Sequence, residues 1–304
     1  IPYTVCGGLQ DNGSWCGPSR RRGPIYNAFW STVSGGDGFH TAQDPTDPAI
    51  VYAESQGGNM SRINVVTGER TPLQKPGFLA RYRLLEDSIL IARGDTTQPA
   101  PRDVQRRVEA LRARQRTDSA EMDIRWNWNT PFFLSPHNPS VFYAGASKVF
   151  KSLERGENLR PISPDLSKQL MARIDTSIRK TGGITRDATG AETYGTVVSL
   201  AESPVRPGLL YAGTDDGNLW ITRNDGASWA RLKGPFPGLP DDTVYVSRIE
   251  PSRFDSATVY VTFDNHRRGD FSPYVYTSTD WFASERRALF LDRATVACLS
   301  ADVR

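Results

Sequence analysis

The stretch Tyr211–Trp229 constrains the fold of this chain more than any other part of the sequence. Short apolar runs alternate in it with two tight turns, which predicts three strands joined by two hairpins. The second turn runs from Thr222 to Trp229 and contains Gly226, which can take the positive φ angle of a tight hairpin without steric cost. The stretch therefore indicates an antiparallel sheet whose tight turns require particular residues.

Polar side chains in this turn predict how it is held together. Asn224 and Asp225 can accept hydrogen bonds from the turn's own backbone N–H groups, and Ser228 offers a hydroxyl for the same purpose. Trp229 can bury its ring between neighbouring sheets. These tasks are structural, so we expect no catalytic role for Asp225. The structural residues of the turn are Thr222, Asp225, Gly226, Ser228 and Trp229.

The turn that leads into this stretch recurs along the chain, which indicates a repeat protein. In each copy a turn containing Pro or Asp precedes a short apolar strand that carries a Tyr. The four copies are Asp44–Ala53, Ser135–Gly145, Ser203–Gly213 and Ser252–Val261. Gly7–Trp15 matches a further, partial copy whose first strand is missing or displaced. Repeats of this kind are ~40–50 residues long, so we expect about five of them.

A second turn follows each full copy, and the second turns differ in completeness. They lie at Val66–Glu69, Ser152–Asn158, Thr222–Trp229 and Ser278–Trp281. The Ser152 turn lacks the acid and the Trp of the Thr222 turn, and the Ser278 turn lacks the Gly. In sequence, the Thr222 turn alone is intact.

Two insertions, at about 76–123 and 164–192, interrupt the repeats, and the first contains the one helix that we expect. Residues 102–116 place apolar side chains on one stripe. The other faces carry Arg106, Arg107, Arg112, Arg114 and Arg116. This helix can lie on the sheets with its arginines in solvent, or the arginines can dock an acidic partner or anionic lipid headgroups. The tail, 281–304, is unrelated to the repeats.

Charge and cysteine content narrow the partners and the compartment. The net charge of +3 does not indicate nucleic acid binding, and no stretch is long enough for a transmembrane helix. Cys6 and Cys16 flank a glycine-rich turn and can close a disulfide loop in an oxidising compartment, which leaves Cys298 as a buried free thiol. Because the chain starts at Ile1 without Met, we expect that a secretory signal was cleaved and that the protein is periplasmic or extracellular.

Several segments together resemble bacterial Asp-box (BNR-repeat) β-propeller proteins, which are labelled glycosyl hydrolases and look like the ten-bladed propeller of sortilin. These segments are Gly7–Ser19, Gly35–Phe39, Asp44–Pro48, Val51–Asn59, Trp126–Pro131, Ile162–Leu166, Ile184–Gly190 and Tyr211–Trp229. The resemblance extends from about Val5 to Asp280 and implies an all-β fold, a single propeller domain over 1–304 with about five blades. Members of the family are usually much longer, so the resemblance implies an incomplete or open propeller here.

The residues do not define a catalytic set. Most glycosidases need two carboxyl groups flanking the scissile bond, and sialidase-type propellers use an Arg cluster, a Tyr–Glu pair and an Asp. The candidate acids are Asp11, Asp37, Asp215, Asp216 and Asp264, all in turns where Asp normally caps backbone groups. The histidines are His40, His137 and His266. They lack metal-ligand spacing, although His40 and His266 can face a shared groove. We expect no catalytic residue, no metal and no cofactor.

Trp126 and Trp128 alternate with Asn127 and Asn129, which predicts a strand with one pair on each side. The two rings can pack between blades, or one of them can stack on a sugar or anchor a partner protein. Both are therefore candidate partner contacts, together with the arginines of the predicted helix.

Three functions remain open from the sequence. We favour a non-catalytic extracytoplasmic interaction protein, because the repeats are degenerate and an open propeller has edge strands that a partner must cover. The chain also resembles membrane-extrinsic periplasmic subunits of photosynthetic reaction centre–antenna complexes of phototrophic bacteria. That resemblance implies protein subunits of a membrane complex as partners, and no bound pigment. The alternatives are a glycosidase or sialidase-like hydrolase and a sortilin-like peptide-binding propeller.

Overall fold

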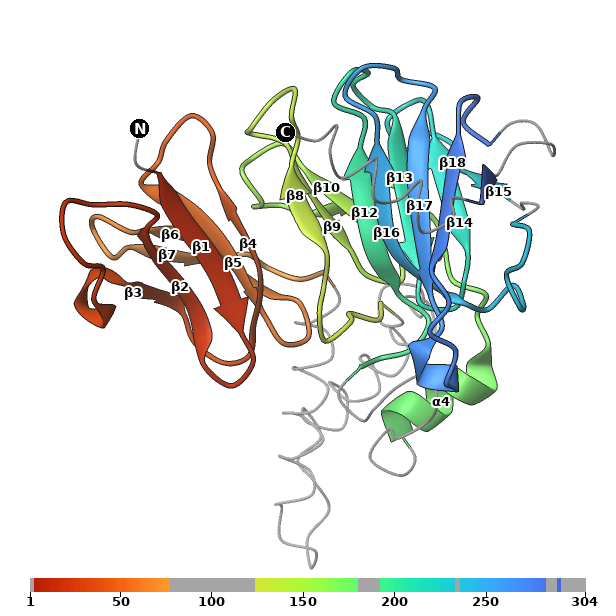
Figure 1. The fold of residues 1–304 in the computed structure, drawn as a ribbon, viewed down its shortest axis with the longest axis horizontal. Helices are drawn as coiled ribbons and strands as arrows, with labels where there is room; N and C mark the ends of the chain where they lie inside the picture. Colours follow the sequence, from red (N-terminus) through yellow and green to blue (C-terminus); the bar gives the residue numbers. More distant parts are fainter. Residues whose placement is uncertain (1–2, 77–123, 180–191, 233–235, 283–288, 291–304) are drawn as a thin grey trace, which may run out of the picture. The chain divides into compact units, whose positions relative to one another are not determined.

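The computed structural model describes residues 3–76, 124–179, 192–232, 236–282 and 289–290, and their strands form five antiparallel sheets (Figure 1). The first sheet contains β1 (Thr4–Leu9), β2 (Gly13–Pro18) and β3 (Ser31–Ser34). The second contains β4 (Gly38–Gln43), β5 (Ile50–Ser55), β6 (Asn59–Asn64) and β7 (Arg70–Pro72). The third contains β8 (Phe132–Leu134), β9 (Phe142–Gly145), β10 (Val149–Ser152) and β11 (Arg160–Pro161). The fourth contains β12 (Val197–Glu202), β13 (Leu210–Thr214), β14 (Leu219–Thr222) and β15 (Ala230–Leu232). The fifth contains β16 (Tyr245–Pro251), β17 (Val259–Asp264), β18 (Tyr274–Ser278) and β19 (Leu289–Phe290).

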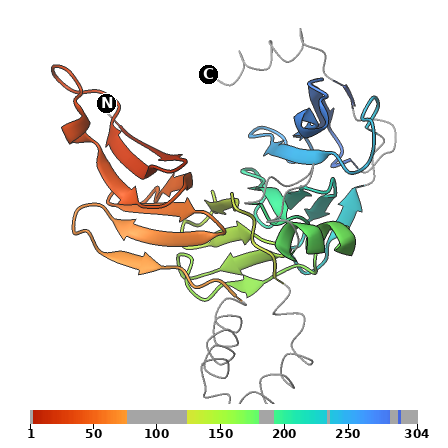
Figure 2. The ribbon, with the colours of Figure 1, turned by 90° about the horizontal axis from the view of Figure 1, so that it is seen from below.

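Every sheet is an up-and-down meander, because its strands pair in the order in which they occur in the chain. Successive sheets also contact one another (Figure 2). Strand β1 contacts β4, β4 contacts β8, β9 contacts β12, and β13 contacts β16. Repeated meanders of four short strands that pack sheet on sheet are blades of a β-propeller. The predicted all-β propeller fold is therefore confirmed, while the total number of blades stays a prediction.

The chain divides into two compact units, of which one comprises 1–73 with 125–304 and the other 74–124. All five sheets belong to the first unit. The predicted arginine-rich helix, 102–116, falls in the second unit and lies outside the described residues, as do Cys298 and most of the tail 281–304. No helix among the described residues is long and apolar enough to cross a membrane.

In the second, third and fourth sheets the second strand is the most buried one, which explains the apolar runs seen in these repeats. All residues of β9 and β13 are buried. Tyr52, Tyr143 and Tyr211 are each at most 2% exposed, whereas Tyr260 is half-buried. The burial of three of these rings supplies much of the packing between sheets.

The turns that open the four repeat copies have one conformation, as the repeats predict. In each, the side-chain oxygen of the first residue accepts the backbone N–H two residues later. The donor and acceptor pairs are Thr46 to Asp44, His137 to Ser135, Val205 to Ser203 and Phe254 to Ser252. Sequence similarity between the copies therefore reflects a shared turn that sets the start of the second strand.

Two local predictions are wrong. The second insertion contains an α-helix, α4 (Met171–Arg179), whereas we expected a helix in the first insertion alone. Ile174 anchors α4 in the core at 2% exposure. The segment around Trp126 and Trp128 is irregular backbone and not a strand. Its backbone is tied instead by side chains, since Thr130 donates its hydroxyl proton to the carbonyl of Asn127.

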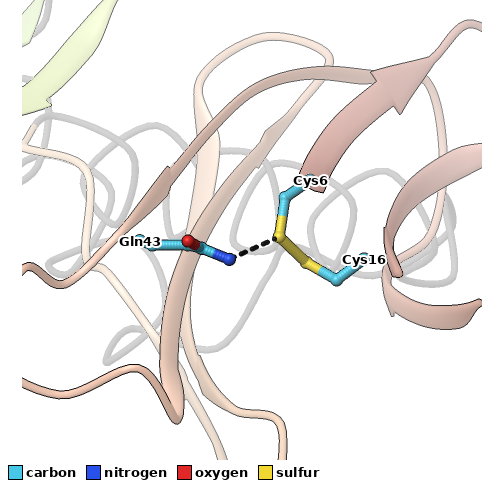
Figure 3. Close-up of a disulfide and its surroundings, with 3 residues drawn as sticks. All are labelled: Cys6, Cys16 and Gln43. Carbon is cyan, nitrogen blue, oxygen red and sulfur yellow. Dashed lines mark hydrogen bonds between the residues drawn. A yellow bond between two sulfur atoms is a disulfide. The ribbon is translucent and has the colours of Figure 1, made fainter. Parts of the chain in front are cut away.

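A disulfide joins β1 and β2, the two strands of the first hairpin (Figure 3). Cys6 of β1 lies directly opposite Cys16 of β2, with their Cα atoms 4.2 Å apart. Gln43 of the neighbouring sheet donates its side-chain amide to Cys6 Sγ over 3.3 Å. The bridge crosses the hairpin beneath the glycine-rich turn and packs against the second sheet with Val51 and Ile63.

Candidate functional site

The Thr222 turn is held by side-chain oxygens that replace missing backbone partners. Thr222 is buried, and its hydroxyl accepts the Gly226 N–H over 3.0 Å while donating to Asn224 Oδ1. Asn224 Oδ1 also accepts the Ser228 N–H, and Asn224 Nδ2 donates to the Ser228 hydroxyl. Such side-chain-to-backbone bonds satisfy groups that a tight turn leaves unpaired.

Gly226 and Trp229 attach this turn to the third sheet. Gly226 has a φ of 89°, and a Cβ added there would come within 2.8 Å of both Cβ and the carbonyl oxygen of Ile162. Trp229 is half-buried and donates its ring N–H to that same Ile162 oxygen over 2.7 Å. The turn therefore needs glycine for its backbone conformation and for lack of space.

Asp225 does a different job from the one predicted. Its carboxylate does not bind the turn's own N–H groups but points to the third sheet. Oδ2 lies 2.5 Å from Lys151 Nζ, and Oδ1 accepts the Tyr143 hydroxyl over 3.1 Å. The Asp225 side chain is thus a link between two sheets, because its own turn is already satisfied by Asn224.

The Ser152 and Ser278 turns have the same backbone structure in spite of their altered sequences. The Ser152 hydroxyl accepts the Gly156 N–H over 3.2 Å, and the Ser278 hydroxyl accepts the Phe282 N–H over 2.7 Å. The bond between the hydroxyl and the N–H four residues later is therefore common to all three turns. In the Ser278 turn Phe282 takes the place of the glycine, at a φ of 56°.

The fourth residue of each of these three turns has a left-handed backbone and reaches a neighbouring sheet. These residues, which we call locking residues, are Arg155, Asp225 and Trp281, with φ of 54°, 58° and 59°. Each donates its N–H to a carbonyl in the turn before the second strand, at Ser140, Gly208 and Ala257 respectively. That bond fixes where the side chain points, so the locking residue always faces the preceding sheet.

Each locking residue and its partner form a pair, which we call a lock, and the three locks use different chemistry. Arg155 forms an ion pair with Asp44 of the second sheet, whose side chain is fully buried. Asp225 pairs with Lys151 of the third sheet. The Trp281 ring lies 4.9 Å from the guanidinium of Arg223 of the fourth sheet, within cation–π range. Sequence reasoning missed Arg155 and Trp281, because neither matches the acid of the Thr222 turn.

Ionisation in these locks follows from burial and charge. Burial tends to raise the pKa of Asp44, but hydrogen bonds from Thr46 and the charge of Arg155 outweigh it and hold that pKa below its ordinary value. The pKa of Tyr143 is raised by burial first, and then by the charges of Glu202 and Asp225. At neutral pH the locks therefore contain an ionised Asp44 and a neutral phenol at Tyr143.

The end of the sheets that carries these turns also exposes large apolar side chains. Val66 is 80% exposed, Leu153 67%, Val205 44% and Phe254 91%. They come from four successive sheets and lie at the tips of first or second turns. We call these four residues the turn-tip residues. All four therefore share the end of the sheets that the first and second turns form.

The candidate acids are used in structural bonds. Asp215 is buried and accepts the N–H groups of Gly195 and Thr196, and the adjacent Asp216 accepts the Lys168 N–H over 2.6 Å. Burial raises the pKa of both carboxyls, and that of Asp215 is raised further by the charge of Asp216. Their turn is the first of the two hairpins predicted within Tyr211–Trp229, and Gly217 donates its N–H to the Thr214 carbonyl in it.

The other candidate acids and the histidines have separate partners. Asp37 accepts the backbone N–H of Asp11, and Asp264 accepts the backbone N–H of His266 and contacts its ring Nδ1. His137 is exposed, and its ring contacts the Ser203 carbonyl over 2.8 Å. Over the described ranges, no group of three or more His, Cys, Asp or Glu side chains could hold a metal ion.

His40 and the two tryptophans face aromatic neighbours. The His40 ring lies edge-on to Phe132, and its pKa is lowered by burial and then by the charge of Arg248. Trp126 stacks on Phe150 with ring centroids 5.4 Å apart. Trp128 meets Phe39 edge-on at 5.1 Å. Both tryptophans are half-buried.

No protein-family model and no curated protein matches this chain. A GH74 xyloglucanase from Xanthomonas campestris is similar in structure with a TM-score of 0.49 and 13% identity, over 92% of this chain and 35% of that one. Sqt1 from Saccharomyces cerevisiae has a TM-score of 0.49 and 11% identity, over 94% of this chain and 56% of Sqt1. A GH74 enzyme from Niastella koreensis has a TM-score of 0.45 and 14% identity, over 83% of this chain and 29% of that enzyme. The chain spans less than two thirds of each of these proteins. Similarity at this level gives no information on individual residues of the site.

Proposed function

We propose that this protein is a non-catalytic extracytoplasmic interaction protein, an extrinsic subunit that stabilises a membrane complex of the photosynthetic reaction centre–light-harvesting kind. The observation that carries the proposal is the set of turn-tip residues, Val66, Leu153, Val205 and Phe254, exposed at one end of four successive sheets. Burial of such side chains in a partner is favourable by about 1.5–3 kcal/mol each. The turn-tip residues are therefore the proposed contact surface.

The turns that carry these residues are suited to binding because they are rigid before the partner arrives. Leu153 belongs to the Ser152 turn, whose hydroxyl and locking residue fix it to the second sheet. Phe254 follows Ser252, whose hydroxyl accepts its N–H over 3.1 Å. A preformed surface loses little conformational entropy on association, so more of the contact energy appears as affinity.

Two further observations support the class of function and its compartment. The buried carboxyls Asp215 and Asp216 are engaged by backbone donors and so serve the packing of the fourth sheet. The disulfide between Cys6 and Cys16 suits an oxidising compartment such as the periplasm. The assignment to Asp-box propellers related to sortilin is part of the same proposal and rests on the bonds of the Thr222 turn.

Native purification from the membrane with mass spectrometry of the accompanying subunits tests this function. We expect the protein in fixed stoichiometry with a membrane complex. In reconstitution, Phe254→Ser and Leu153→Ser should each weaken binding about tenfold or more, by loss of about 1.4 kcal/mol or more. Phe271→Ser is the matched control, because Phe271 is 80% exposed at the opposite end of the fifth sheet.

Two results would contradict the proposal. One is recovery of the native protein as a free monomer. The other is turnover of aryl-glycosides or sialosides that is abolished by Asp215→Asn while the fold is retained, which would establish the hydrolase alternative.

A further inference from the structure

A basic, aromatic loop leaves the first sheet between β2 and β3. The stretch from Asn12 to Gly36 contains no Asp or Glu but holds Arg20, Arg21 and Arg22 in succession. We call residues 19–30 the basic loop. Its charge is therefore entirely positive, within a chain whose charges elsewhere are mixed.

The basic loop presents apolar side chains to solvent on a fixed backbone. All residues from Arg20 to Phe29 are exposed. Ile25 is 42% exposed, Tyr26 61% and Phe29 36%. A 3-10 turn, η1 (Asn27–Phe29), holds the tip, and the rings of Tyr26 and Phe29 lie 6.1 Å apart. The Arg21 guanidinium lies 3.5 Å from the Phe29 ring centre, so cation and ring are displayed together.

Strand β1 extends this apolar surface. Tyr3, 70% exposed, accepts the N–H of Ser19 where the loop begins. Val5, 42% exposed, lies opposite Gly17, and the Trp30 ring occupies the space that a Gly17 side chain would need. Apolar and aromatic side chains thus continue from the loop onto the sheet.

None of the three loop arginines has an ion-pair partner within the described part of the chain. Unpaired guanidinium groups bind phosphate oxygens well, often through two parallel hydrogen bonds. The loop therefore offers phosphate-binding cations beside side chains that favour the boundary between water and hydrocarbon.

We propose that the basic loop is a membrane anchor that docks on anionic lipid headgroups, with Ile25, Tyr26 and Phe29 inserted at the acyl boundary and the three arginines on lipid phosphates. Hot spots between proteins are usually seated in pockets. Here the apolar groups project from an exposed loop, which fits insertion between headgroups. The anchor does not depend on the proposed scaffold function, because it uses the first sheet and not the turn-tip residues.

Each basic residue near an anionic membrane contributes about 1 kcal/mol, so the triple variant R20Q/R21Q/R22Q should bind vesicles about a hundredfold more weakly. The test is co-sedimentation of the full chain with phosphatidylcholine vesicles, with and without phosphatidylglycerol, at low and high salt. We expect binding only to the anionic vesicles, weakened by salt. Thermal unfolding of each variant verifies that the fold is retained.

The control R206Q/R248Q/R253Q removes the same charge from exposed arginines of the fourth and fifth sheets and should change binding less than threefold. Y26S/F29S keeps the arginines and should weaken vesicle binding about tenfold. Equal binding to neutral and anionic vesicles, or equal loss in the control, would overturn the proposal. If Y26S/F29S bound like the wild type, the arginines would be attracted to any acidic surface, such as an acidic protein, and the lipid anchor would be refuted.

Discussion

The Thr222 and Ser278 turns carry the same hydrogen bonds on different sequences. In both, a buried hydroxyl accepts the N–H of the fifth residue. That fifth residue is Gly226 in one turn, crowded by Ile162, and Phe282 in the other, whose ring lies 5.7 Å from that of Phe236. The hydroxyl is therefore the shared requirement, and glycine is needed where a neighbouring sheet leaves no room for a side chain.

Gly226→Ala should have the largest effect of the substitutions that test this difference between the two turns. A Cβ there would enter the space of Ile162, and the φ of 89° disfavours any side chain, so we expect a loss of about 3 kcal/mol in the free energy of unfolding. Urea denaturation measures it. Gly269→Ala is the control, since Gly269 has a φ of 78° with nothing near its absent Cβ and should lose only about 1 kcal/mol. Equal losses would show that crowding by Ile162 is unimportant.

Removal of the hydroxyls should affect both turns alike. Thr222→Val and Ser278→Ala each leave part-buried N–H groups of the turn without an acceptor, at a cost of about 2 kcal/mol. Thr222→Ser keeps the oxygen and should cost under about 1 kcal/mol. The same urea titrations report these values. A Ser278→Ala variant as stable as the wild type would mean that the two turns are held differently.

The locks should behave as separable pairs. In a double-mutant cycle, Lys151→Met and Asp225→Asn should show a coupling of about 0.5–1 kcal/mol, reduced by the 47% exposure of the Asp225 side chain. Pairing Lys151→Met with Arg155→Met provides the control, because Arg155 contacts Asp44 and not Lys151. If the losses of stability in the first cycle were additive, Asp225 would not link the two sheets.

The smallest expected effect is on pH dependence. Because the pKa of Asp44 is lowered in the folded protein, its ionised form stabilises the fold above the unfolded-state value, and this contribution is lost as pH falls through the folded pKa. Stability should therefore fall below about pH 4, and less steeply in Asp44→Asn. Unfolding midpoints measured from neutral to acid pH give both curves. Parallel curves would indicate that Arg155 and Thr46 do not favour the carboxylate.

The sequence predicts the repeats well because their information is local. The first turns use a side-chain oxygen and an N–H two residues apart, as at Ser203 and Val205, so a short motif carries the whole interaction. Helix α4 is less visible, since nine residues without an acidic first turn give a weak signal, and Ile174 is buried by tertiary contacts.

The locking residues could not be found from any motif. Arg155 and Asp44 are 111 positions apart, and only the packing of two sheets brings them together. Two of the turn-tip residues, however, can be recognised from their positions in the repeated sequence. Val205 and Phe254 occupy the same position in two copies of a turn, where a solvent-exposed site normally carries a polar residue.

The varied chemistry of the locks has a consequence for assembly of the fold. Five similar sheets risk docking in the wrong order or exchanging with those of another molecule. The native order of the second to fifth sheets brings each locking residue to a suitable partner, an acid for Arg155, a base for Asp225 and a guanidinium for Trp281. Specificity of this kind is a difference in energy between the right and the wrong neighbour. The three locks thus bias the second to fifth sheets toward their native order, although the strands themselves are similar.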